Sequence, residues 1–105
     1  MSAAQAAAAE AAKEKAAVDA EAKAAEQARI EAEAKAAELY STAAEYPNAP
    51  AYVARDVARC LEKAGQPRAA YDYWVEKIWR HDRRIRNNLD RAIVEREIRR
   101  LEEHL

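Results

Sequence analysis

Glycine, proline and cysteine are scarce in this chain of 105 residues, and phenylalanine is absent. One glycine and three prolines supply few of the turns that sheets and loop-built active sites need. The abundant alanine, glutamate, lysine and arginine favour helices instead. The single Cys60 excludes an internal disulfide and a cysteine metal cluster, which favours a reducing compartment. These shortages predict an all-α protein.

Long apolar runs are also missing, because no stretch approaches the ~20 consecutive apolar residues of a transmembrane helix. The first residues, Met-Ser-Ala-Ala-Gln, lack the basic start and bulky apolar run of a signal peptide. A cytoplasmic location is therefore favoured, although a segment excised from a longer protein would look the same.

The charges nearly cancel, with 18 basic and 19 acidic side chains, but they are unevenly placed. Residues 1–46 carry five basic and nine acidic side chains, a net charge of −4. Residues 47–105 carry thirteen and ten, a net charge of +3. Nothing in the total charge indicates nucleic acid or an anionic membrane as a partner.

Three segments are expected within a single domain. Residues 1–46 form one long alanine-rich helix, which ends because Pro47 keeps the preceding residue out of helical geometry. Residues 47–82 form a helical hairpin whose turn lies at Gly65, the residue best suited to a left-handed helix end. Residues 83–105 form an arginine-rich amphipathic helix. It either continues the second hairpin helix or starts afresh after a break at Asn87-Asn88.

The hairpin repeats a pattern from the long helix, since Ala36 and Tyr40 are followed 34 residues later by Ala70 and Trp74. A period of 34 is that of the tetratricopeptide repeat. Residues 50–82 resemble one such repeat, above all in the stretch Leu61-Glu62-Lys63-Ala64-Gly65-Gln66-Pro67-Arg68-Ala69-Ala70-Tyr71-Asp72-Tyr73-Trp74. The resemblance implies a helical hairpin that needs neighbouring helices to bury its second face. The pattern departs from the family at Ala54, Lys77 and Asp82.

Two sets of apolar residues follow from this organisation. The first is the predicted core around Trp74, which comprises Tyr40, Val57, Leu61, Ala70 and Trp74 itself. The second is a stripe in the last segment with no evident cover in the chain: Ile85, Leu89, Ile93, Ile98, Leu101 and Leu105. Because exposed apolar stripes of this length usually meet a partner, the stripe predicts a homo-oligomer or a docked helical protein. In the long helix, a sparser stripe with Val18 and Leu39 fits a solvated spacer and a packed helix equally well.

The sequence contains no pattern typical of catalysis, and we predict no catalytic, cofactor-binding or metal-binding residues. His81 and Asp82 are adjacent, so on a helix they face different directions and cannot form a base with its orienting partner. Cys60 lies within an amphipathic helix, where a buried packing thiol is the ordinary interpretation. The chain lacks a glycine-rich phosphate loop and a histidine pair at ligand spacing. We therefore expect no cofactor and no enzymatic activity.

Eight arginines between residues 80 and 100 raise one alternative, because guanidinium groups bind phosphate. Acidic residues are interleaved with them at four-residue spacing, which is typical of a helix laced with ion pairs. The favoured hypothesis is accordingly a non-enzymatic helical scaffold or adaptor that mediates protein–protein interaction or self-assembly. The alternative is a small nucleic-acid-binding protein that uses these arginines.

Overall fold

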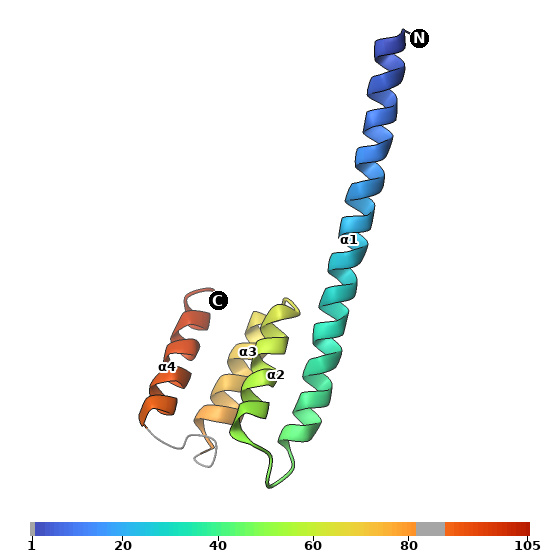
Figure 1. The fold of residues 1–105 in the computed structure, drawn as a ribbon. Helices are drawn as coiled ribbons and strands as arrows, with labels where there is room; N and C mark the ends of the chain where they lie inside the picture. The colour runs from blue at the N-terminus through green and yellow to red at the C-terminus, as the bar shows by residue number, and fades with distance from the viewer. Residues whose placement is uncertain (1, 82–87) are drawn as a thin grey trace.

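The computed structural model describes residues 2–81 and 88–105, and these form an all-α structure. The helices are α1 (Ala3–Ala44), α2 (Ala51–Lys63), α3 (Pro67–Tyr73), a π-helical continuation η1 (Trp74–Trp79) and α4 (Asn88–Glu102). The chain is 84% helical, and the described residues contain no strand. The predicted fold class is confirmed at this level. In Figure 1, α2, α3 and α4 lie beside the lower part of α1, and α4 is the helix farthest from it.

Helix α1 begins and ends where its sequence provides the signals. The amide N–H of Gln5 donates to Ser2 Oγ (3.1 Å), and the amide N–H of Ser2 donates to Gln5 Oε1 (2.9 Å). This reciprocal capping box satisfies amide groups that the first helical turn leaves free. At its other end α1 stops at Ala44, three residues before Pro47.

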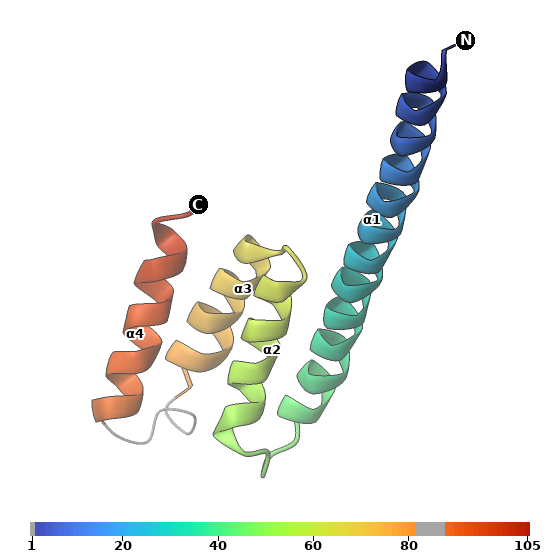
Figure 2. The same ribbon diagram turned by 45° about the horizontal axis from the view of Figure 1, so that its top comes forward.

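The length of α1 sets the shape of the molecule. Its 42 residues, at ~1.5 Å each, span about 63 Å. The chain measures 71 × 28 × 19 Å with a radius of gyration of 20.9 Å, whereas a compact chain of this length has a radius near 13 Å. The protein is therefore a rod with a helical head at one end, as Figure 2 shows from a second direction. We use "head" for α2, α3, η1 and α4 together with residues 30–44 of α1.

The hairpin of α2 and α3 turns at Gly65, which has a φ of 75°. The N–H groups of Gly65 and Gln66 donate to the carbonyl oxygens of Glu62 and Leu61, so the last turn of α2 is closed by backbone bonds. Pro67 occupies the first turn of α3, where its missing N–H costs nothing. These features place the turn where the sequence predicts it.

The core lies in the head and draws on every helix. Its largest fully buried side chains are Trp74, Ile78, Leu101, Val57 and Val94. Around them lie four small buried residues, Ala44, Ala54, Ala58 and Ala70. Leu61 is partly buried and packs against this cluster. Tyr40 does not belong to it, because its side chain is 43% exposed.

The second hairpin helix is not continuous with the last segment, so the interpretation as one helix is wrong. Its final six residues, Trp74–Trp79, form a π-helix, and neither Arg80 nor His81 is helical. Helix α4 begins at Asn88 and lies back against η1 and α3. The π-turns add residues per turn, so Trp79 is brought to the side of the helix that packs against the core. Asn87 lies outside the described residues.

Replacing Trp74 by alanine should remove the largest side chain of the core. Trp74 is only 2% exposed, and a Trp→Ala cavity of this kind costs about 3–5 kcal/mol. We expect a large fall in the denaturant midpoint of unfolding, which circular dichroism measures. As a control, Tyr52→Ala removes an aromatic side chain that is 63% exposed and should change the midpoint little. Equal midpoints for the parent and Trp74→Ala would contradict the placement of Trp74.

Candidate protein-interaction surfaces

More than half of α1 extends beyond the head with every side chain exposed. The guanidinium of Arg29 donates to the carbonyl oxygen of Lys63, the last residue of α2, at 3.4 Å. This contact marks where the cover from α2 ends, since residues 2–29 are all exposed. The uncovered stretch from Ala3 to Ala28 is about 39 Å long at ~1.5 Å per residue.

Within the head, α1 is covered on one flank only. Ala37 and Ala44 face α2 and are 3% and 1% exposed. Leu39 is 67% exposed and Tyr40 is 43% exposed, because both lie on other sides of the helix. Trp74, which follows Tyr40 by 34 residues, is 2% exposed. The prediction that Tyr40 belongs to the core therefore needs correction.

The difference between Tyr40 and Trp74 has a simple structural cause. In α3 and η1, the helix that bears Trp74 is preceded in the chain by α2, which packs against it. No helix precedes α1 in the described residues, so the equivalent flank of α1 has no cover. The residue pattern occurs twice in the sequence. Only at its second occurrence, around Trp74, does a preceding helix cover the aromatic side chain.

Helix α4 runs antiparallel to α3 and η1. Near its start the guanidinium of Arg91 lies over the ring of Trp79, 5.2 Å from the centroid. Near its end, the hydroxyl of Tyr71 donates to Glu102 Oε1 at 2.9 Å. These contacts join the beginning of one helix to the end of the other, which fixes the direction of α4.

Two ion pairs join α4 to α2, and both helices run in the same direction. At the start of each helix, Arg55 Nη2 lies 2.9 Å from Asp90 Oδ1. Towards their ends, Arg100 makes two bonds to the Glu62 carboxylate, at 2.6 and 2.8 Å, and two to Glu97 Oε2, at 2.7 and 3.1 Å. The paired residues are 35 and 38 apart in the sequence, close to the 34-residue spacing of the pattern.

The prediction that the C-terminal apolar stripe needs a partner for cover is wrong for Ile98 and Leu101, in the last turns of α4. Leu101 is 1% exposed within the core, and Ile98 is partly buried against the same core. Ile93 is also partly buried, whereas Leu105 is 51% exposed. The stripe is covered because the chain turns back after Trp79. Ile85 and the side chain of Leu89 lie outside the described residues.

Sequence reasoning missed Val94, which is fully buried with Leu101. The signal was available, since Val94, Ile98 and Leu101 recur at helical spacing on one face of α4. The spacing shows that this face is apolar, but it does not show that the face packs against the helices of the same chain.

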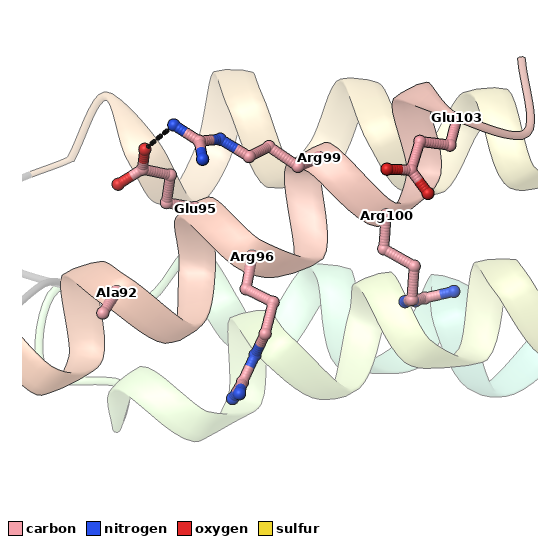
Figure 3. A pocket seen from close by; sticks show the side chains of 6 residues that line it. All are labelled: Ala92, Glu95, Arg96, Arg99, Arg100 and Glu103. Carbon is pink, nitrogen blue, oxygen red and sulfur yellow. Dashed lines mark hydrogen bonds and ion pairs between the residues drawn. The ribbon is translucent and has the colours of Figure 1, made fainter.

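The outward side of α4 is charged. It forms a shallow hollow of about 480 Å³ that only this helix lines, with Ala92, Glu95, Arg96, Arg99, Arg100 and Glu103. Figure 3 shows the ion pair of Glu95 with Arg99 across the outer surface, while Arg96 and Arg100 extend to the side where α2 lies. A charged outer surface is typical of the terminal helix of a repeat array, which must be solvated.

A groove runs along the seam between α4 and the helix formed by α3 and η1. Its walls carry Tyr71, Val75 and Trp79 on one side and Ile98 on the other, and its volume is about 360 Å³. Glu95, Arg99 and Glu102 line the same groove with charge. The volume lies at the lower end of the range for small-molecule sites.

Most of the C-terminal arginines that the structure describes are engaged within the chain. Arg80 pairs with Glu76, Arg99 with Glu95 and Arg100 with Glu62 and Glu97. Arg91 stacks over Trp79. Arginines held in this way would have to give up intramolecular contacts to bind phosphate. Arg83, Arg84 and Arg86 lie outside the described residues.

The chemistry-bearing side chains do not gather. Among residues 2–81 and 88–105, no three His, Cys, Asp or Glu side chains are grouped so as to hold a metal ion. Burial raises the pKa of the Cys60 thiol, and a hydrogen bond with Glu33 raises it further. None of the helices described is long and apolar enough to cross a membrane.

Comparison with known proteins identifies no relative, since no protein family, curated protein sequence or solved structure matches the chain.

The raised pKa of Cys60 predicts a slow reaction with alkylating reagents. At a given pH less of the thiol is ionised, and the thiolate is the nucleophile. In the folded protein at pH 8, iodoacetamide should modify Cys60 several times more slowly than it modifies the same thiol in denaturant, as measured by mass spectrometry. Modification at equal rates in the two states would contradict this environment. Glu33→Gln should restore part of the rate.

The ion pair of Glu62 with Arg100 predicts a loss of stability in acid. A hydrogen bond from Arg100 lowers the pKa of Glu62 below the model-compound value of 4.5. The stabilisation is therefore complete above that value and disappears as the pH falls through the lower pKa of the folded state. Both side chains are more than a third exposed, so solvent screening limits the effect to roughly 1 kcal/mol or less.

The measurement is the free energy of unfolding in urea between neutral pH and pH 3. Glu62→Gln should lower it at neutral pH and flatten its dependence on pH in the acid range. Glu14→Gln, an exposed position on the rod, should leave the curve unchanged. A pH dependence that is the same in Glu62→Gln as in the parent would contradict this assignment.

Proposed function

We propose that the protein is a non-enzymatic helical scaffold or adaptor that mediates protein–protein interaction or self-assembly. The observation that carries the proposal is the exposed flank of α1, where Leu39 and Tyr40 stand uncovered at the level of the head. Large apolar side chains on a helix flank next to a packed core are typical of a surface that another helix covers.

The similarity to tetratricopeptide repeats supports the same function. Helices α2 and α4 run parallel, with α3 and η1 between them. The two residues of each ion pair that joins α2 to α4 are 35 or 38 positions apart in the sequence, about the length of one repeat. Such arrays stack helices so that each repeat covers its neighbour, and they bind other proteins on the surfaces left open. We infer that this chain contains one such hairpin, with flanking helices on both sides.

The two ends of this helix array differ in a way that favours a protein partner at one of them. At the α4 end the outer surface is charged and suits solvent. At the α1 end the flank is apolar, with Leu39 and Tyr40 exposed. A partner helix packed on α1 would extend the array of helices at the end where its apolar residues are exposed.

Nucleic-acid binding through the C-terminal arginines is the competing function, and salt distinguishes the two. Binding to phosphates should weaken by about a thousandfold or more between about 50 and 200 mM salt, whereas an apolar helix interface should persist. We expect no change in the fluorescence polarisation of labelled single-stranded or duplex RNA and DNA at micromolar protein. We also expect a solution mass above that of the monomer at both salt concentrations. Tight nucleic-acid binding with a steep salt dependence would contradict the proposed function.

A further inference from the structure

Two of the large apolar side chains left exposed along α1 fall on one row. Val18 and Leu39 are 63% and 67% exposed and are three heptads apart, whereas Tyr40, 43% exposed, lies beside this row. Between residues 4 and 39 every position on this row is apolar, and every side chain on it is exposed: Ala4, Ala11, Val18, Ala25, Ala32 and Leu39. We call these six positions the heptad row.

A period of seven indicates the kind of neighbour that would cover the row. On a straight α-helix, residues seven apart drift around the axis by about 20° per heptad, so such a row stays in line only when two helices supercoil. The flank that faces α2 contains a second row of this kind, with Ile30, Ala37 and Ala44. One row of α1 is therefore already used to pack against a helix, and the other is not.

The length of the heptad row restricts its occupant. From Ala4 to Leu39 the row is about 53 Å long at ~1.5 Å per residue. Helices α2 and α4 have 13 and 15 residues, about 20–23 Å, and the outer surface of α4 is charged. Among the helices that the structure describes, only α1 itself is long enough to cover the row.

Building on the proposed scaffold function, we propose that α1 pairs with the α1 of a second copy of this chain in an antiparallel coiled coil. The heptad row forms one line of the interface. The residues four positions further along form the other: Ala8, Lys15, Ala22, Arg29, Ala36 and Ala43.

Charge selects the antiparallel direction. In a parallel pair in register, Lys15 would face the second Lys15 and Arg29 the second Arg29, which is repulsive. In the antiparallel register centred on Ala22 and Ala25, Lys15 faces alanine 32 of the second copy and Arg29 faces its valine 18. No like charges then meet along the two interface rows. Within its own chain Arg29 already pairs with Glu26 and donates to the carbonyl oxygen of Lys63, so its charge is compensated there.

The sizes of the side chains favour the same register. Leu39 faces alanine 8 of the second copy, and Ala11 faces alanine 36. A large side chain thus meets a small one, so the two helix axes can stay close along the whole pair. In the parallel pair Leu39 would meet Leu39 and Ala25 would meet Ala25, which demands two different spacings.

The heads do not collide in this arrangement. Helix α2 covers residues 30–44 of α1, and in this register that segment lies beside residues 3–17 of the second copy, which are uncovered. Each head is therefore placed next to the free end of the other rod. In this arrangement the second copy packs along the part of α1 that its own chain leaves uncovered.

The test is the solution mass of the full chain by sedimentation equilibrium, at concentrations up to high micromolar. We expect a dimer. Ala11→Glu with Ala25→Glu places two charges opposite alanines and should raise the dissociation constant by about a hundredfold or more, with unchanged helix content and tryptophan fluorescence. The matched control, Ala6→Glu with Ala20→Glu, adds the same charges at the same spacing on the opposite flank and should remain dimeric.

Direction is tested by disulfide trapping in a Cys60→Ser background. Copies with Ala11→Cys mixed with copies with Ala36→Cys should form a mixed disulfide, because these positions face each other only in the antiparallel pair. Efficient linking of Ala11→Cys to itself would instead demonstrate a parallel pair and overturn the proposal.

Two further outcomes would also overturn it: a monomeric parent at high micromolar concentration, or a dimer that survives the Ala11→Glu and Ala25→Glu changes. A surviving dimer would move the interface elsewhere and leave the scaffold function standing. Salt-dependent nucleic-acid binding would instead remove the scaffold function itself.

Discussion

The packing of Trp74 between its neighbouring helices is the interaction on which the head depends. Trp74 and Ile78 lie at the centre of a cluster that takes residues from α1, α2 and α4. Most of the other buried positions are alanines, which bury little area and contribute little stability each. A head of this size therefore holds together through a few large side chains, and each helix is anchored by its contact with them.

The return of α4 determines which surfaces remain available for partners. By lying back on η1 it buries Val94 and Leu101, and its ion pairs with Arg55 and Glu62 tie it to α2. The apolar stripe that the sequence displays near its end thus completes the core of its own chain. The charged outer surface of α4 then closes one end of the helix array, so the exposed apolar residues of α1 become the main candidates for binding.

The unequal lengths of the helices connect fold and function. A hairpin of 13-residue helices can cover only about 20 Å of a rod that is about 63 Å long. The remainder is helical because alanine, glutamate and lysine favour helices without tertiary support. The uncovered part of α1 is therefore available to another molecule, and its row of exposed apolar residues fits a helical partner.

The sequence by itself determined the helices and most of their ends, because those depend on local features: the alanine-rich run, Pro47, Gly65 and Pro67. It also placed Val57, Ala70 and Trp74 on faces that the structure buries. Only the tertiary structure decided the break after Trp79, the burial of Leu101 and the exposure of Tyr40. Each of these depends on where a distant helix lies, and helical periodicity shows that a face is apolar without showing what covers it.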